Sequence, residues 1–289
     1  MNEKVNRGFL IGIVIIGLIY GWQKTNAQSI HETGVLCSSP VISRISVLSI
    51  HVRDTLVHDS VFHFLTDKLG LSVEYYPVKY ADRWYAGVYA GNMFLEPCGP
   101  FSNFHYASNR FKAIFFGLNC ESERSISSLA EDLTSRNISI KQTGTIQIID
   151  TTFISQNIYL NIASGNESNS KREDSLRTEM LRRNENALGI ETIKEIRVGY
   201  SEGTALIKWK QLIEPSVITP EGMWKINEDQ SIRLVKSSIN EVKGIVFRVR
   251  SLKKAKSWLI DNNLIGDIRG DEIELDKLKT FGLTILLSE

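Results

Sequence analysis

The stretch from Ser46 to Pro100 constrains the fold more than any other part of this chain. Its apolar pattern predicts a strand over Ser46–Val52, a helix over about Val57–Leu69 and then three short strands. The helix carries apolar residues three and four apart, and Gly70 follows it as a stop signal. One strand, one helix and three strands together predict a unit in which the helix packs on a small curved sheet.

Two side chains of this stretch point to chemistry. His51 ends the first strand, and Glu96 ends the last one, Met93–Glu96. Inward-pointing side chains on these two strands can share a divalent metal ion, because imidazole and carboxylate are both common ligands. The alternative is a half-buried histidine that bonds a nearby carboxylate. His58 and His63 fall off the apolar stripe of the helix, and solvated positions are expected for both.

The strand in the middle of the stretch is rich in aromatic residues. The candidates for lining a concave sheet and holding an anionic or aromatic ligand are Arg83, Trp84, Tyr85 and Tyr89. Ordinary strand packing with an exposed arginine explains the same residues. The sequence alone leaves both interpretations open.

The same order of elements returns along the chain. A second unit is predicted over Ala113–Ile162, and a third and a fourth over 193–235 and 242–287. The segment Ala163–Ala187 is polar and charged, which predicts a linker with a solvated helix over Ser175–Asn186. The predicted fold is therefore α+β, with tandem βαβββ modules paired into two cupped mixed-sheet domains.

The amino terminus has the features of a signal peptide. Lys4 and Arg7 precede a short apolar run, Phe9–Tyr20, and small residues precede a cleavage point after Ala27. Export to the periplasm or the extracellular space is expected, and the alternative is a membrane anchor formed by the uncleaved segment. The expected division is 1–27 signal peptide, 28–43 lead-in, 44–165 first domain, 166–187 linker and 188–289 second domain.

Charge and cysteine content narrow the classes of partner. The 34 Lys and Arg residues nearly balance 33 Asp and Glu residues, and no basic cluster carries interleaved aromatics, so nucleic acid is not expected. A small-molecule ligand is expected, and a homodimer is left open. Export would permit one disulfide among Cys37, Cys98 and Cys120, and unpaired buried thiols are the alternative.

Residues 46–100 resemble the vicinal oxygen chelate superfamily, the group of glyoxalases, bleomycin resistance proteins and extradiol dioxygenases. The segments that carry the resemblance are Ser49-Ile50-His51-Val52-Arg53-Asp54, Leu69-Gly70-Leu71 and Gly91-Asn92-Met93-Phe94-Leu95-Glu96. The resemblance implies that His51 and Glu96 bind a divalent ion (Fe, Mn, Zn or Ni) and that Glu96 can act as general base. It implies substrate contacts for Arg83, Trp84 and Tyr89. Elsewhere only the βαβββ order supports it.

The resemblance is incomplete at the matching positions of the other units. Gly117 and Asn161 stand there in the second unit, and Arg248 and Leu287 in the fourth, so Asn161, His105 or water would have to complete a metal site. The implied function is a metal-dependent lyase, isomerase or dioxygenase acting on a small substrate with two neighbouring oxygens. The alternatives are a non-catalytic small-molecule binding protein of the same fold and a structural or interaction module.

Overall fold

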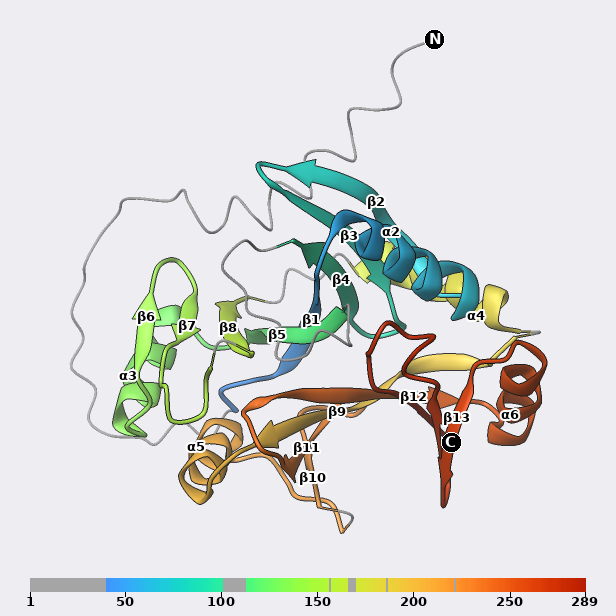
Figure 1. Cartoon of the computed structure of the whole chain (residues 1–289). Coiled ribbons are helices and arrows are strands. Elements are labelled where there is room, and N and C mark those ends of the chain that lie inside the picture. Colours follow the sequence, from blue (N-terminus) through green and yellow to red (C-terminus); the bar gives the residue numbers. More distant parts are fainter. Residues whose placement is uncertain (1–39, 101–112, 156, 166–169, 186, 221) are drawn as a thin grey trace.

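The computed structural model describes residues 40–100, 113–155, 157–165, 170–185, 187–220 and 222–289. Within these residues the chain forms two mixed sheets, one from each half, that pack against each other with helices around them (Figure 1). The predicted α+β fold is confirmed.

The amino-terminal half contains two of the predicted units. The first consists of β1 (Arg44–Val52), α2 (Thr55–His63), the π-helical turn η1 (Phe64–Lys68), β2 (Ser72–Tyr80), β3 (Arg83–Tyr89) and β4 (Phe94–Gly99). The second consists of β5 (Ala113–Ser122), α3 (Ile126–Ser135), β6 (Ile140–Gln142), β7 (Ile146–Ile148) and β8 (Tyr159–Ser164). Their strands form one eight-stranded sheet in the order β2-β3-β4-β1-β5-β8-β7-β6.

The carboxy-terminal half repeats this plan with one strand fewer, which is missing from its third unit. Its third unit consists of β9 (Ile190–Tyr200), α5 (Gly203–Ile213), β10 (Met223–Lys225) and β11 (Ser231–Lys236). The fourth consists of β12 (Glu241–Val249), α6 (Leu252–Asp261), β13 (Ile265–Arg269), β14 (Glu272–Leu275) and β15 (Ile285–Ser288). These strands form a seven-stranded sheet in the order β10-β11-β9-β12-β15-β14-β13.

Local sequence signals set the ends of the first helix. The side chain of Asp54 accepts a hydrogen bond from the Val57 amide at 2.8 Å and so caps the helix. Gly70 has φ +68, a conformation that favours glycine, and it ends the helix as predicted. The final turn is π-helical, and the carbonyl of Thr66 in it is one of the last of the helix, which have no partner within the helix and accept from other donors.

Helix α4 (Ser170–Asn184) joins the two halves and is partly buried. Leu176, Met180 and Asn184 are buried in it, so the helix is less solvated than the polar sequence predicts. The guanidinium of Arg183 donates to the carbonyls of Thr66 and Leu71 at 2.6 and 2.9 Å. The connection between the halves is therefore bonded to the first unit.

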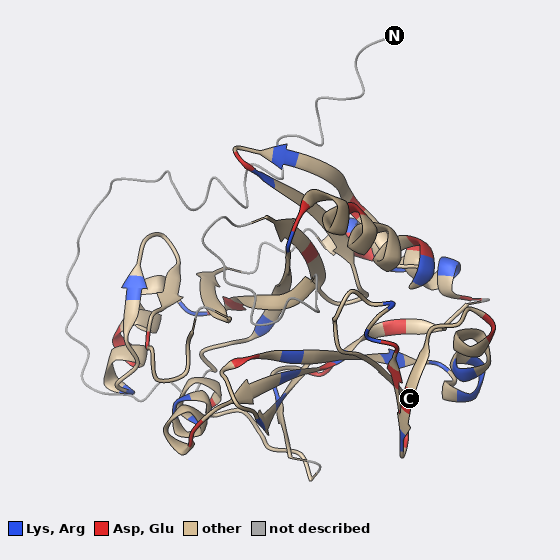
Figure 2. Ribbon diagram, viewed as in Figure 1, with Lys and Arg blue, Asp and Glu red and all other residues tan. Residues whose placement is uncertain are grey.

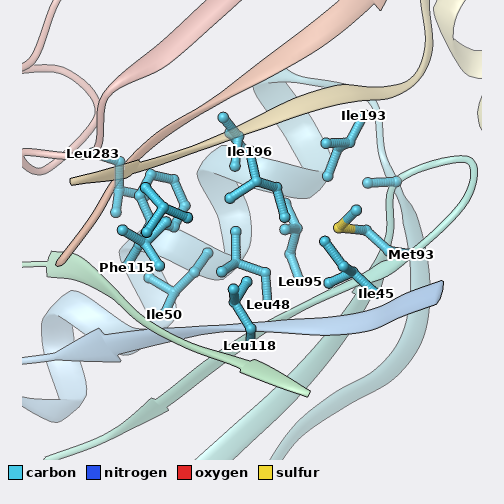
Figure 3. Close-up of a cluster of buried hydrophobic side chains, with 14 of the residues drawn as sticks. Ile45, Leu48, Ile50, Met93, Leu95, Phe115, Leu118, Ile193, Ile196 and Leu283 are labelled. Atoms are coloured by element: carbon cyan, nitrogen blue, oxygen red, sulfur yellow. The ribbon is translucent and has the colours of Figure 1, made fainter. Parts of the chain in front are cut away.

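An apolar core lies between the two sheets (Figure 3). The side chains labelled in that view are Ile45, Leu48, Ile50, Met93, Leu95, Phe115 and Leu118 from the amino-terminal half and Ile193, Ile196 and Leu283 from the carboxy-terminal half. All of them are buried and belong to one continuous cluster, so the two halves share a core. In the described part of the chain, no helix is both long and apolar enough to cross a membrane.

Two amide side chains tie the halves together beside this core. Gln230 accepts from the Ile45 amide and donates to the Ile45 carbonyl, each at 2.9 Å. Asn92 does the same for Ile193, accepting from its amide at 3.1 Å and donating to its carbonyl at 2.9 Å. Each half therefore supplies an amide that pairs with a strand of the other half, and we call these contacts the amide lock.

Candidate functional site

One face of the eight-stranded sheet points away from the seven-stranded sheet, and we call it the cup face. Parallel pairing of β1 with β4 places Ser49 opposite Glu96 and His51 opposite Cys98. Paired residues point to the same side of a sheet, so these four share the cup face, whereas Leu48 points into the core between the sheets. The sequence prediction that His51 and Glu96 share one face is consistent with this register. Along the paired strands, His51 and Glu96 are offset by two residues.

His51 is fully buried. Burial, and secondly the positive charge of Arg83, lower its pKa from 6.5 to about 4, so the imidazole is neutral at physiological pH. The ring of Phe116 on β5 lies next to it, with ring centroids 5.3 Å apart. An aromatic ring from the second unit therefore packs beside His51.

The carboxylate of Glu96 is engaged by a tyrosine. Tyr75 on β2 donates its hydroxyl to Oε1 of Glu96 at 2.7 Å. Its ring lies across Gly87 on β3, where a Cβ atom would come within 2.3 Å of a ring carbon. Burial raises the pKa of Glu96, and the hydrogen bond from Tyr75 opposes that effect.

A second tyrosine enters the cup face from the opposite side. The ring of Tyr159 on β8 lies across Gly117 on β5, where a Cβ atom would come within 2.5 Å of it. Its hydroxyl is 2.7 Å from Oγ of Ser49 and accepts from Nδ2 of Asn119 at 3.4 Å. Asn161, the residue aligned with Glu96 in the second unit, donates to Asn119 at 3.1 Å. The two tyrosine hydroxyls thus end at neighbouring residues, Ser49 and Glu96.

The predicted ligand-binding residues of β3 do not all share this face. Tyr85 pairs with Cys98 and lies on the cup face, and Arg83 lies near enough to affect the pKa of His51. Trp84 alternates to the other face, where its ring centroid lies 6.3 Å from that of His58. Trp84 therefore does not face the cup, and its predicted contact with a ligand stays a prediction. The period-two alternation of a strand explains the difference.

Tyr89, the third predicted contact, lies at the far end of its strand. Its hydroxyl donates to the Gly91 carbonyl at 2.9 Å, and it lines a polar cavity of about 410 Å³ between α4 and the turn Asn227–Gln230. Arg44, also in this cavity, begins β1, whereas His51 lies near its other end, roughly 20 Å away at 3.3 Å per residue. This cavity is separate from the cup face.

The side chains of the cup face do not fit the expected metal ion. A divalent ion needs several convergent donors, yet Oε1 of Glu96 is taken by Tyr75 and Phe116 flanks His51. No three His, Cys, Asp or Glu residues converge on a common point in the part of the chain that the structure describes. His105 lies outside the described residues. The described donor set is that of a hydrogen-bonding site.

The thiols do not complete a metal site. Cys98 and Cys120 are buried and free, and burial raises the pKa of both, so neither is a thiolate at neutral pH. Cys37 lies outside the described residues. The sequence left open a disulfide or unpaired buried thiols, and Cys98 and Cys120 are unpaired buried thiols.

The seven-stranded sheet carries an ion-pair network where the other sheet carries its tyrosines. Glu195 is buried and bonds Arg197 at 2.6 Å and Arg233 at 3.0 Å, and Arg197 also pairs with Glu272. Charged residues accordingly mark the strands of this sheet in Figure 2. This face is occupied by paired charges.

Register corrects one aligned position in the fourth unit. Arg248 pairs with Ser288, and Val246 pairs with Leu286. If Arg248 corresponds to His51, the position of Glu96 falls on Leu286, whereas Leu287 points into the core. Neither leucine is a metal ligand, so the expectation that this unit lacks the glutamate is unchanged.

Comparison with known proteins identifies the fold. The sequence matches no known family and no curated protein. A triple mutant of 4-hydroxymandelate synthase from Streptomyces coelicolor is similar with a TM-score of 0.55 and 12% identity over 85% of this chain and 92% of that one. A variant of homoprotocatechuate 2,3-dioxygenase from Brevibacterium fuscum is similar with a TM-score of 0.56 and 12% identity over 88% of this chain and 73% of that one. The 2,3-dioxygenase LapB from Pseudomonas sp. KL28 is similar with a TM-score of 0.53 and 11% identity over 86% of this chain and 93% of that one.

These structures define the class of the fold. They belong to the vicinal oxygen chelate superfamily, so the resemblance inferred from residues 46–100 is confirmed at the level of the fold. At such low identity the similarity extends to the paired modules and carries no residue roles.

Sequence reasoning missed Tyr75 and Tyr159, although a signal was present. Gly87 and Gly117 lie inside strands that are rich in aromatic and aliphatic residues, and a glycine inside a strand often marks a place where another group approaches closely. The approaching groups are the two tyrosine rings. The sequence does not identify these two tyrosines, because the separation along the chain between each glycine and its tyrosine is different in the two units.

Proposed function

We propose that this protein binds a small molecule on the cup face of its amino-terminal half, without catalysis by a metal ion. The fold similarity supports a small-molecule site, since one of the similar structures is a complex of homoprotocatechuate 2,3-dioxygenase with 3,4-dihydroxyphenylacetate. The observation that carries the proposal is the hydrogen bond from Tyr75 to Oε1 of Glu96, which engages the carboxylate within a hydrogen-bonded cluster of the protein's own side chains.

The chemistry of the cup face supports an aromatic ligand that carries an anionic group. Arg83 supplies a positive charge near His51, and Tyr85 and Phe116 supply aromatic surface on the same face. His51 stays neutral and so adds no second positive charge beside Arg83. Together these groups orient a small ligand with few polar contacts.

The second candidate is a metal-dependent lyase, isomerase or dioxygenase. One observation favours it: His51 and Glu96 stand on the same face of adjacent strands, and the imidazole is in its neutral, ligating form. The engaged carboxylate and the neighbouring Phe116 weigh against it, so no reaction step is assigned to these residues.

Metal analysis combined with a binding measurement decides between the two candidates. The purified protein is incubated with Fe²⁺, Mn²⁺, Zn²⁺ or Ni²⁺, desalted and analysed for bound metal, and 3,4-dihydroxyphenylacetate is titrated by calorimetry with and without a chelator. We expect no stoichiometric metal and binding that the chelator leaves unchanged. Arg83→Gln should weaken binding, and Arg269→Gln, at an exposed site in the other half, is the control. Stoichiometric metal that is lost in both His51→Ala and Glu96→Ala would establish the second candidate.

Export remains part of the proposal. The basic and apolar segment 1–27 lies outside the described residues, and its composition supports cleavage after Ala27 and a periplasmic or extracellular location. Mass spectrometry of the native protein should find an amino terminus at or near Gln28. A full-length chain in the membrane fraction would instead support the uncleaved anchor. Size-exclusion chromatography of the same material tests the homodimer.

A further inference from the structure

One hydroxyl hydrogen at the centre of the cup face has no hydrogen-bond acceptor among the described residues. Ser49 and Tyr159 each carry one hydroxyl hydrogen, and the 2.7 Å bond between them uses one of the two. Tyr159 also receives a hydrogen bond from Asn119, whose own carbonyl oxygen accepts from Asn161. No acceptor for the remaining hydrogen is found among the described residues. Ser49 is 1% exposed, so this donor is buried at the base of the cup face.

Glu96 provides the complementary group beside it. Oε1 of Glu96 accepts from Tyr75, and in the described part of the chain no donor reaches its second oxygen. Ser49 and Glu96 are direct partners on adjacent parallel strands, which run about 4.8 Å apart. A spare donor and a spare acceptor therefore stand side by side.

The two tyrosines hold this arrangement in place. Each ring lies close to a glycine, and neither ring can keep this position if the glycine carries a side chain. The hydroxyls therefore reach Ser49 and Glu96 from opposite sides, as fixed partners. A site whose polar groups are fixed before binding loses little entropy when the ligand arrives.

We propose that Ser49, Tyr159 and Glu96 form a recognition site for a neutral group with an acceptor and a donor on neighbouring atoms, a carboxamide being the simplest. The inference rests on the proposed function and names a second, neutral polar group of the same ligand, apart from the anionic group assigned to the neighbourhood of Arg83. The Ser49–Tyr159 pair donates to the carbonyl oxygen, and the amide N–H donates to Glu96. A carboxylate is disfavoured at this position, because it offers no donor and places a second negative charge beside Glu96.

The test compares benzamide with benzoate, which has nearly the same shape but lacks the donor. Binding is followed by ligand-observed NMR with the full chain. Wild type should bind benzamide about tenfold more tightly than benzoate. Tyr159→Phe, Ser49→Ala and Glu96→Gln should each weaken benzamide binding about five- to tenfold, as expected for the loss of one hydrogen bond. Tyr76→Phe, an exposed tyrosine outside the cup face, should leave it unchanged.

The outcomes separate this inference from the proposed function. Equal affinity for benzamide and benzoate, or benzamide binding that Tyr159→Phe and Ser49→Ala both leave unchanged, would overturn the recognition site. If 3,4-dihydroxyphenylacetate binds and benzamide does not, the recognition site is wrong and the proposed function stands. If neither compound binds, the proposed function is wrong as well. Circular dichroism of each variant checks that it is folded.

Discussion

A buried neutral histidine makes stability depend on pH. The pKa of His51 is about 4 in the folded protein and 6.5 in the unfolded chain, so between these values the unfolded chain binds more protons. Stability therefore rises with pH from about 4 to 6.5 and is lost as pH falls through that window. At about 1.4 kcal/mol per pKa unit, the loss amounts to roughly 3 kcal/mol.

This pH dependence can be measured in one variant and its control. In urea unfolding between pH 4 and 7, His51→Asn should show a smaller loss of stability at low pH than wild type. The control is His63→Asn, because that side chain is 66% exposed. Equal pH profiles for His51→Asn and wild type would show that His51 is not the group responsible.

The contact between Tyr75 and Gly87 predicts a second effect at the residue scale. In Gly87→Ala the new methyl group would stand 2.3 Å from the ring, so the ring must move and its bond to Glu96 weakens. We expect a loss of about 1–3 kcal/mol in the free energy of unfolding. Gly203→Ala is the control, because nothing lies within 4 Å of the added atom. A Gly87→Ala variant as stable as wild type would contradict the close approach.

Single residues show where sequence reasoning succeeds and where it fails. His51 and Glu96 share one face, as the sequence predicts, because they lie an even number of residues apart in the register of β1 and β4. His58 was expected in solvent, but it is fully buried, because Trp84 packs against its side of the helix. The apolar periodicity of a helix predicts which apolar residues are buried. It does not predict the burial of a histidine that is covered by an aromatic side chain distant in the sequence.

At the scale of elements, the amide lock predicts a measurable coupling between the halves. Gln230→Ala leaves the buried amide and carbonyl of Ile45 without partners and should cost about 1–3 kcal/mol. Asn262→Ala removes a single bond from an exposed amide to a helix carbonyl and should cost far less. Urea unfolding midpoints compare the two, and similar values would argue against the lock.

The order of elements was predictable, but the contacts between them were not. The strand and helix periods of the first unit predicted its elements to within a few residues, and Asp54 and Gly70 mark the ends of the first helix. The contacts of α4 with the first unit join residues more than a hundred positions apart. Apolar periodicity reports which side of an element is buried, but it does not identify the partner.

At the scale of the whole molecule, the division at 166–187 stays a prediction, and limited proteolysis tests it. A first cut near 166–169 is expected from composition. After such a cut we expect the two fragments to co-elute in size-exclusion chromatography, because separation would expose the core between the sheets and break the amide lock. Two separately eluting, folded fragments would instead establish independent domains.

The amide lock also has a consequence in time. The first strand of the protein is synthesised early, yet the side chain that completes its pairing at Ile45 follows 185 residues later. At ribosomal rates of about 5–20 residues per second, that interval lasts roughly 10 to 40 s. During it the nascent amino-terminal half presents an unfinished edge and an uncovered apolar surface. A chain released before residue 230 would remain in that state, so chaperone dependence should fall sharply once synthesis passes this point.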